Sequence, residues 1–158
     1  MELTHGSLFS GIGGFEIGFE RAGFRTLWQV EIDDYATKVL EKNFPHAQRF
    51  RDIKTVGRHN LAVPTVVTGG FPCQDISHAG KRAGLAGSRS GLWVEFRRII
   101  DELRPRYVVV ENVSALYQRG IDRVLGDLAE SGYDAEWDCL PAAAFGAPHL
   151  RERIWIVA

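Results

Sequence analysis

The chain has 158 residues, a length that suits one domain with a sizeable core, and its 45% hydrophobic and 25% charged residues are ordinary for a soluble globular protein. The formal net charge of −1 argues against a nucleic-acid surface spread over the whole chain, and two cysteines are too few for a disulfide framework and favour a reducing, cytosolic setting. No run reaches the roughly 18 apolar residues of a membrane span, and the N-terminal stretch lacks the pattern of a signal peptide.

Short apolar runs alternate with amphipathic segments, and this alternation predicts an α/β fold with a mostly parallel sheet. A first strand is expected to end at 7–9, and a helix over 13–23 to stop at a glycine. A second strand over 25–32 precedes a helix that has an aspartate cap and ends before Pro45. The other expected strands are 47–50, 65–68, 107–112, 133–140 and 153–158, and the other expected helices are 92–103 and 121–132.

The strand over 107–112 is continuously apolar for most of its length, which is typical of a strand buried on both faces. Ligands of open parallel sheets bind outside the carboxyl ends of the strands. Chemically active residues recur at these ends, so one site is expected there. They are Gly11, Gly13 and Gly14 after the first strand, Glu31 and Asp33 after the second, Asp52 after the third, Cys73 after the fourth, and Glu111 and Asn112 at the fifth.

The stretch FSGIGGF is a glycine-rich turn between the first expected strand and helix. Glycines let a cofactor approach the backbone closely, and the helix start offers free N–H groups. The spacing lacks the full G-x-G-x-x-G dinucleotide pattern, so a turn needed only for packing is the alternative. Glu31, about 20 residues later, can accept both hydroxyls of a ribose. A solvated charge or helix cap is the other interpretation, and it suits Asp33 and Asp34 better.

In the stretch GGFPCQDIS, Cys73 follows Pro72 just past the end of an apolar run, where the chain must turn. A thiol buried for packing would lie within the run, so this position favours a nucleophile activated by nearby cations. Residues 76–94 contain no acidic residue and supply such cations, namely His78, Lys81, Arg82 and Arg89. For Cys139 we expect a packing role.

Glu111 ends the apolar strand, where partial desolvation would raise its pKa toward a value useful for proton donation. Capping of the segment that begins near Ser114 is the alternative for Glu111, and Asn112 could cap equally well. Arg151 and Arg153 lie two residues apart at the start of the last expected strand, so they share a face and suit a phosphate or a base edge. The alternative is a charged device that protects an edge strand.

Four stretches together resemble the DNA (cytosine-5) methyltransferase family, in order and spacing, across essentially the whole chain. SLFSGIGGFEIGFERAGF resembles the first motif, GGFPCQDIS the catalytic loop, ENV the sixth motif and RERIWIV the arginine motif. The resemblance implies a Rossmann-like S-adenosylmethionine-dependent methyltransferase fold. It also implies S-adenosylmethionine as the cofactor, no metal ion, and double-stranded DNA with a flipped cytosine as the partner.

The resemblance further implies a role for each matching residue. Cys73 would add to carbon-6 of cytosine, Glu111 would contact ring nitrogen-3 and donate a proton, and Arg151 and Arg153 would hold the flipped base and the Glu111 region. The implied cofactor contacts are Phe9, Gly11, Ile12, Gly13, Glu31, Ile32, Asp52, Ile53, Pro72 and Leu92. Gln74, Ser77 and Arg89 belong to the implied loop that closes over DNA.

Three positions depart from the family pattern. Ser7 stands where aspartate is common, Ile32 replaces a tryptophan that packs on adenine, and His149 replaces a glutamine. The chain also stops at Ala158, right after the arginine motif, whereas family enzymes continue with a target-recognition domain and two further motifs. We therefore expect a single catalytic domain over 1–158, C-terminally truncated, which is a truncated copy, a fragment or one half of a split enzyme.

The expected function is methylation of carbon-5 of cytosine in DNA, in the cytoplasm of a bacterium or phage-infected cell, associated with the nucleoid, as part of a restriction-modification system. The chain alone is expected to be incomplete, with a second chain supplying the missing domain and motifs. The alternative is a non-catalytic subunit or remnant that binds cofactor or DNA. The glycine spacing and the FPC stretch argue against a nicotinamide or flavin oxidoreductase, and an RNA substrate is the remaining variant.

Overall fold

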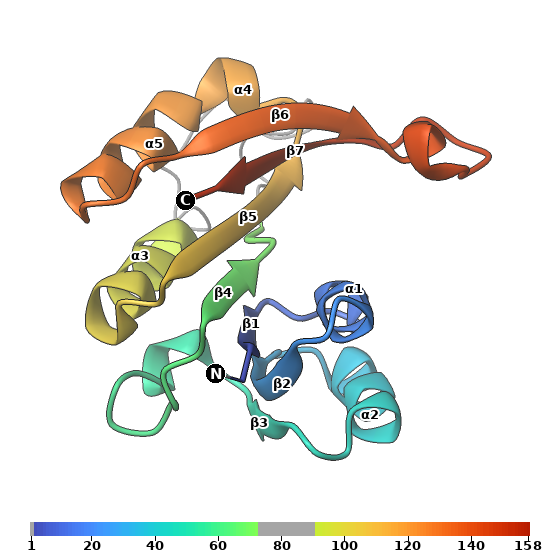
Figure 1. Cartoon of the computed structure of the whole chain (residues 1–158), viewed down its shortest axis with the longest axis vertical. Coiled ribbons are helices and arrows are strands. Elements are labelled where there is room, and N and C mark those ends of the chain that lie inside the picture. Colours follow the sequence, from blue (N-terminus) through green and yellow to red (C-terminus); the bar gives the residue numbers. More distant parts are fainter. Residues whose placement is uncertain (1, 73–90) are drawn as a thin grey trace.

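The computed structural model describes residues 2–72 and 91–158, and these residues fold around one seven-stranded sheet (Figure 1). The strand order is β3-β2-β1-β4-β5-β7-β6. The first five strands run parallel, whereas β7 is antiparallel to both of its neighbours. The strands are β1 (Thr4–Leu8), β2 (Arg25–Val30), β3 (Gln48–Phe50), β4 (Val66–Gly69), β5 (Tyr107–Val113), β6 (Glu136–Pro141) and β7 (Glu152–Val157).

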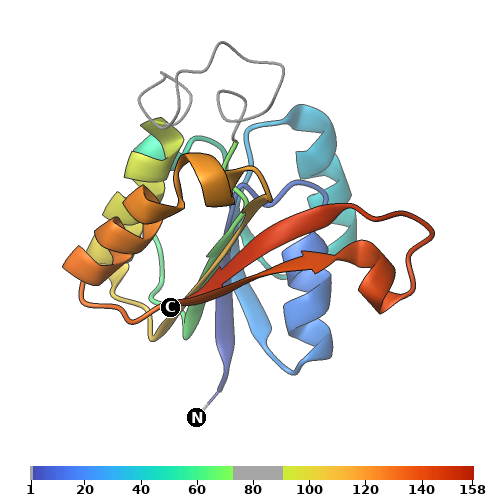
Figure 2. The same ribbon diagram turned by 90° about the horizontal axis from the view of Figure 1, so that it is seen from above.

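Helices cover the two faces of the sheet unequally (Figures 1 and 2). One face carries α1 (Gly14–Arg21) and α2 (Asp34–Asn43), and the other carries α3 (Gly91–Leu103), α4 (Leu116–Arg119) and α5 (Ile121–Glu130). Two short 3-10 helices are η1 (Ile53–Thr55) and η3 (Ala142–Phe145), and η3 lies at the tip of the β6–β7 hairpin, which projects on the side of α1. Within residues 2–72 and 91–158, no helix has the length and apolar character needed to cross a membrane.

The predicted α/β class with a mostly parallel sheet is confirmed, but the burial predicted for the fifth strand is wrong. Along β5, Val108 and Val110 are buried, whereas Val109 and Glu111 are half-buried. Val109 and Glu111 point to the face that carries α1, where both line a cavity. Among the described elements no helix covers this part of the sheet, so one side of β5 stays partly open (Figure 2).

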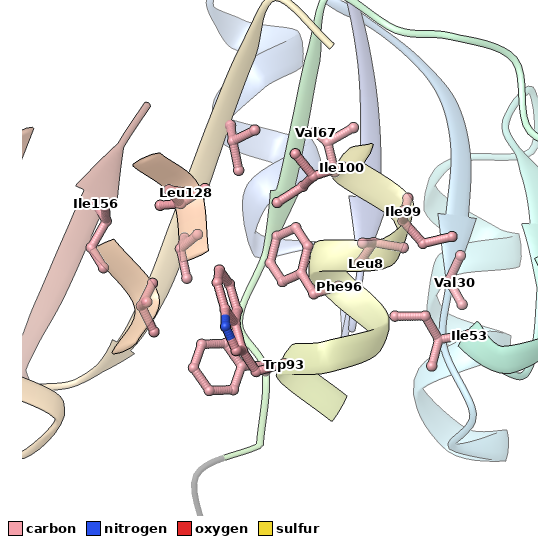
Figure 3. Packing of buried hydrophobic residues seen from close by; sticks show 14 of the residues in the cluster. Leu8, Val30, Ile53, Val67, Trp93, Phe96, Ile99, Ile100, Leu128 and Ile156 are labelled. Atoms are coloured by element: carbon pink, nitrogen blue, oxygen red, sulfur yellow. The ribbon is translucent and has the colours of Figure 1, made fainter. Parts of the chain in front are cut away.

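The main core lies between the sheet and α3 (Figure 3). The helix places Phe96, Ile99 and Ile100 at 0% exposure, as its apolar spacing of three and four residues requires. The indole of Trp28 packs over Gly6 of β1 so closely that a Cβ atom at Gly6 would overlap the ring. Packing in this core holds the parallel strands in place. It therefore determines where the residues that follow the strand ends, such as Gly11 and Glu31, are located.

A histidine is buried on the α1 side of β1. His5 is 0% exposed, its Nε2 lies 2.8 Å from Thr68 Oγ1, its Nδ1 lies 3.4 Å from Thr26 Oγ1, and its ring stacks on Phe19. Burial lowers the pKa of His5 from 6.5 to about 3, because the neighbours are neutral and the charged imidazole would lose its water.

His5 therefore destabilises the fold as pH falls below 6.5. The unfolded chain binds a proton at this residue between pH 6.5 and 3 and the folded chain does not, so the free energy of unfolding decreases by about 2 kcal/mol by pH 5. Denaturant unfolding of the wild type and of His5→Gln at pH 7 and pH 5 measures this effect. The quantity compared is the change in the free energy of unfolding between the two pH values, wild type minus variant, which gives a double difference. A double difference near zero would contradict the assignment.

Candidate active site

The glycine turn between β1 and α1 has the backbone that its sequence predicts. Gly11 has φ 55° and Gly13 has φ 95°, in the left-handed region that favours glycine. Gly13 also precedes α1 as its N-cap, with no side-chain cap, and a Cβ atom there would overlap the ring of Phe44. The first turn of α1 therefore keeps free N–H groups beside a backbone that a ligand can approach closely.

Glu31, which directly follows β2, is bonded to this turn. Its Oε2 accepts the N–H of Gly11 at 2.7 Å and its Oε1 accepts the N–H of Asp33 at 2.8 Å. Asp33 caps α2 by accepting the N–H of Ala36 at 2.8 Å, which confirms the capping interpretation for that residue. Each carboxylate oxygen of Glu31 keeps further acceptor capacity, so the group fits two ribose hydroxyls beside the turn.

The other predicted cofactor residues are placed differently from one another. Ile12 is 62% and Ile32 is 69% exposed, so both offer apolar surface. Asp52 caps η1 by accepting the N–H of Lys54 at 2.9 Å, while Ile53 is buried in the core cluster. Phe9 and Leu92 pack at the edge of that core, and Pro72 is half-buried. Their contact with a cofactor stays a prediction.

Glu111 and Arg153 form an ion pair across β5 and β7. Arg153 Nε lies 3.0 Å from Glu111 Oε1, and the two side chains are 23% and 25% exposed. Burial raises the pKa of Glu111, and the charges of Arg153 and then Arg151 act against this effect without cancelling it. The geometry thus gives a carboxyl group whose proton is held more tightly than usual and whose orientation is fixed by a guanidinium group.

Arg151 differs from the sequence expectation. It lies before β7 rather than within it, with φ 36°, so the two arginines do not share a strand face through regular alternation. Both nevertheless line the same cavity as Glu111. The prediction of a common site for these three residues therefore agrees with the geometry, although the strand argument behind it was wrong for Arg151.

The cavity has a volume of about 860 Å³ and extends from the glycine turn along α1 to the β6–β7 hairpin. It brings together Phe9 and Gly11 from the cofactor predictions with Glu111, Arg151 and Arg153 from the catalytic predictions. Glu31, Asp52, Ile53, Pro72 and Leu92 are not among its lining residues. Cys73, Gln74, Ser77 and Arg89 lie outside the described residues.

Two positioning roles could not be identified from the sequence pattern, although Asn112 was among the residues expected at the strand ends. Asn112 Nδ2 donates to the carbonyl oxygen of Phe71 at 3.1 Å and thereby holds the chain two residues before Cys73. A Cβ atom at Gly70 would lie 2.7 Å from Glu111 Oε2, so only glycine leaves the carboxyl group its place. Trp155, which also lines the cavity, could have been predicted from the sequence. It lies two residues after Arg153 in β7, so the two side chains point to the same face of the sheet.

The comparison with known proteins assigns the chain to a family. The sequence matches the C-5 cytosine-specific DNA methylase model over residues 3–158. It is 38% identical over 167 residues to the type II methyltransferase M1.HphI of Haemophilus parahaemolyticus, with 98% of this chain and 45% of the relative covered. It is 34% identical over 157 residues to M.NgoFVII of Neisseria gonorrhoeae, with 96% and 42% covered. The chain thus spans about half the length of the curated relatives it matches.

Solved structures agree with the fold. Entamoeba histolytica methyltransferase EhMeth superposes with a TM-score of 0.84 at 18% identity, covering 99% of this chain and 52% of the other. Schizosaccharomyces pombe Dnmt2 superposes with a TM-score of 0.81 at 20% identity, covering 99% and 49%. Identities this low support the methyltransferase fold alone. Because the family match extends over nearly the whole sequence, the chain belongs to the C-5 cytosine-specific DNA methylases.

Proposed function

We propose that this chain is the cofactor-binding and catalytic part of an enzyme that methylates carbon-5 of cytosine in DNA. The observation that carries the proposal is the Glu111–Arg153 ion pair, with the pKa of Glu111 raised by burial, in a cavity that begins at the glycine turn. The family match over residues 3–158 adds the substrate class. A carboxyl group with a raised pKa carries its proton over a wider pH range, so it can donate a proton to a ring nitrogen, which is the help that cytosine needs to accept a nucleophile.

The proposed chemistry divides between the residues as follows. The Cys73 thiolate bonds to carbon-6 of cytosine while Glu111 donates its proton to nitrogen-3, so the ring becomes electron-rich at carbon-5. Bound S-adenosylmethionine supplies an electrophilic methyl group. Carbon-5 takes up this methyl group, water accepts the carbon-5 proton, and the bond between carbon-6 and sulfur breaks, which releases the Cys73 thiolate. Nitrogen-3 returns its proton to Glu111, so the ring and both residues are restored. Arg153 fixes the orientation of Glu111 throughout, and Arg151 faces the same cavity.

For the cofactor, the fitting residues are the glycine turn and Glu31. Gly11 and Gly13 present backbone without a Cβ atom, and the Glu31 carboxylate remains available to two ribose hydroxyls. The predicted adenine contacts of Ile32, Asp52 and Ile53 belong to this proposal. Calorimetry is expected to show that Glu31→Ala weakens S-adenosylmethionine binding about tenfold or more, while Glu41→Ala on the exposed face of α2 leaves it unchanged. Equal affinities in the two variants would contradict the ribose role.

We further propose that duplex DNA with a flipped cytosine is the substrate and that additional polypeptide completes the enzyme. The half-buried face of β5, beside a cavity of about 860 Å³ with Phe145 exposed at its rim, supports a covering segment. The relatives are about twice as long as this chain, which supports the same idea. A second chain could supply the segment. A non-catalytic subunit that only binds cofactor or DNA is the alternative.

A trapping experiment tests the function. DNA with 5-fluorocytosine blocks the final elimination, so a working nucleophile stays covalently attached. We expect mass spectrometry to find an adduct on Cys73 in the presence of S-adenosylmethionine, and none with Cys73→Ser. If the chain alone gives no adduct, the complex with its co-purifying polypeptide is tested in the same way. Absence of the adduct from both would contradict the proposal.

Gly70→Ala separates the site from the fold. The added methyl group would displace the Glu111 carboxyl group and its ion pair with Arg153, and among the described residues its nearest neighbours all belong to Glu111. We expect adduct formation to slow by about tenfold to a hundredfold with little change in the unfolding midpoint. Gly69→Ala is the contrasting variant, because its methyl group would meet the buried ring of Phe96 and lower stability instead.

A further inference from the structure

A carboxyl group lies fully buried beneath the glycine turn. Glu16, in the first turn of α1, is 0% exposed, and its Oε1 accepts a hydrogen bond from Nε2 of Gln29 on β2 at 3.2 Å. Gln29 is also 0% exposed. The second oxygen of each side chain, Glu16 Oε2 and Gln29 Oε1, is buried without a hydrogen-bond partner in the described structure.

Two buried acceptors without a donor are costly, and both belong to side chains that already share one hydrogen bond. A carboxyl group and a primary amide are both planar forks. When the N–H that lies cis to the amide oxygen makes this bond and the two groups are coplanar, the other two arms face each other. In that arrangement one proton on Glu16 Oε2 satisfies both acceptors at once.

Within residues 2–72 and 91–158, the groups that face Glu16 supply no compensating charge. β1 and the turn after it contribute the hydroxyls of Ser7 and Ser10, and Ser10 Oγ donates to Ser7 Oγ at 3.0 Å. The titratable group on the same side of β1 is His5, which burial keeps neutral, and Glu31 beyond the end of β2 is bonded to the turn. Burial raises the pKa of Glu16, and the polar groups of its own backbone, Ser7, Gln29 and Ser10 act in the opposite direction.

We propose that Glu16 is a neutral carboxylic acid in the folded chain and forms a two-bond cyclic pair with Gln29. Glu16 Oε2–H donates to Gln29 Oε1, and Gln29 Nε2–H donates to Glu16 Oε1. The pair fastens the start of α1 to β2 on the inner side of the glycine turn, while the Glu31–Gly11 bond fastens the turn at the end of β2. Both contacts stabilise the same glycine turn. The Glu16–Gln29 pair keeps both of its hydrogen bonds only while Glu16 is protonated.

The proposal gives a definite pH dependence. The unfolded chain releases the proton of Glu16 near its ordinary pKa of 4.5, whereas the folded chain keeps it to higher pH. Between these values the folded state binds more protons, so the stability contribution is complete below pH 4.5 and is lost as pH rises through the folded pKa. This trend is opposite to that of His5.

Carbon-13 NMR of the glutamate side-chain carboxyl carbons tests the protonation state without cofactor or DNA, so the result is independent of the proposed function. The Glu16 signal is assigned by its disappearance in Glu16→Gln. We expect its chemical shift at pH 7 to be that of a carboxylic acid. A chemical shift typical of a carboxylate at pH 7 would overturn the proposal. In that case a buried water or the Ser7 hydroxyl would donate the hydrogen bond to Oε2.

The same variant gives a second readout with an opposite sign for the two interpretations. In Glu16→Gln, two amides can form the same two-bond pair without a proton that titrates. The variant should therefore have a higher unfolding midpoint than the wild type at pH 8, where the unfolded wild type has released its proton. At pH 4.5 the two midpoints should be nearly equal. An ionised Glu16 that accepts from Ser7 would instead make Glu16→Gln lower the midpoint at pH 8. Glu41→Gln, on the exposed face of α2, is the control and should not change the midpoint at either pH.

Discussion

Glu111→Gln is expected to lower the rate of methyl transfer by about 10²–10⁴-fold, the range for loss of a positioned general acid. Glutamine keeps the size of the side chain and can still contact a ring nitrogen, but it has no carboxylic proton to deliver. The charge attraction to Arg153, whose Nε lies 3.0 Å from Oε1, is lost as well, so that arginine holds the side chain less firmly. The rate is measured as tritium transfer from labelled cofactor to DNA by the chain in its complete, active assembly.

The pH profile distinguishes proton donation from a purely structural role. Because burial raises the pKa of Glu111, the acid form persists to higher pH than for an ordinary glutamate, and the wild-type rate should fall as pH rises through that pKa. Glu111→Gln should lack this descending limb. Glu152→Gln is the matched control, since Glu152 lies between the two cavity arginines but is exposed. A rate for Glu111→Gln within about threefold of the control would refute the acid role.

Much of the fold follows from local patterns because most elements bury one regular face. The apolar spacing in α3 and the caps and stops of α1 and α2 placed these helices to within about two residues. α4 was missed because four residues are too few to display a helical period. The prediction that β5 is buried on both faces is wrong because apolar side chains in the stretch YVVV show only that burial is possible. Whether each face of β5 is buried depends on whether a helix covers it.

The site was predictable to the extent that it depends on strand ends. Parallel strands bring their carboxyl ends to one edge of the sheet, so the glycine turn, Glu31 and Glu111 were expected to converge. The Glu111–Arg153 contact depends on how β7 pairs with β5. These two residues are 42 positions apart in the sequence, so their pairing cannot be seen in any local pattern. The same holds for Gly70 and Asn112, whose roles exist only through contacts with Glu111 and Phe71.

Asp127→Ala is expected to lower the free energy of unfolding by about 3 kcal/mol. This aspartate joins α5 to α3, since it is 6% exposed and accepts the indole N–H of Trp93 at 2.7 Å together with Arg97 at 2.7 Å and Arg123 at 2.9 Å. Its removal leaves the buried N–H of Trp93 without an acceptor, which costs about 1–3 kcal/mol, and ends two charge-assisted bonds whose arginines stay partly solvated. At this chain length the melting temperature should fall by about 6–12 °C.

Glu130→Ala provides the comparison for the ionic part alone. Glu130 binds the same Arg97 at 2.8 Å but is 71% exposed, so its loss should cost at most about 0.5 kcal/mol. A cost for Asp127→Ala as small as this would show that the indole bond contributes nothing. A double-mutant cycle with Trp93→Phe measures that bond directly, because Asp127→Ala should cost less once the indole donor is absent.

The same cycle bears on catalysis, because Trp93 stands where α3 begins and its ring packs on Phe71, at 5.3 Å between centroids. Phe71 is also held by Asn112, so the chain on both sides of residues 73–90 is anchored through one aromatic contact. An Asp127→Ala variant that remains folded below its melting temperature should therefore form the Cys73 adduct more slowly than Glu130→Ala. Equal adduct rates in the two folded variants would confine Asp127 to stability.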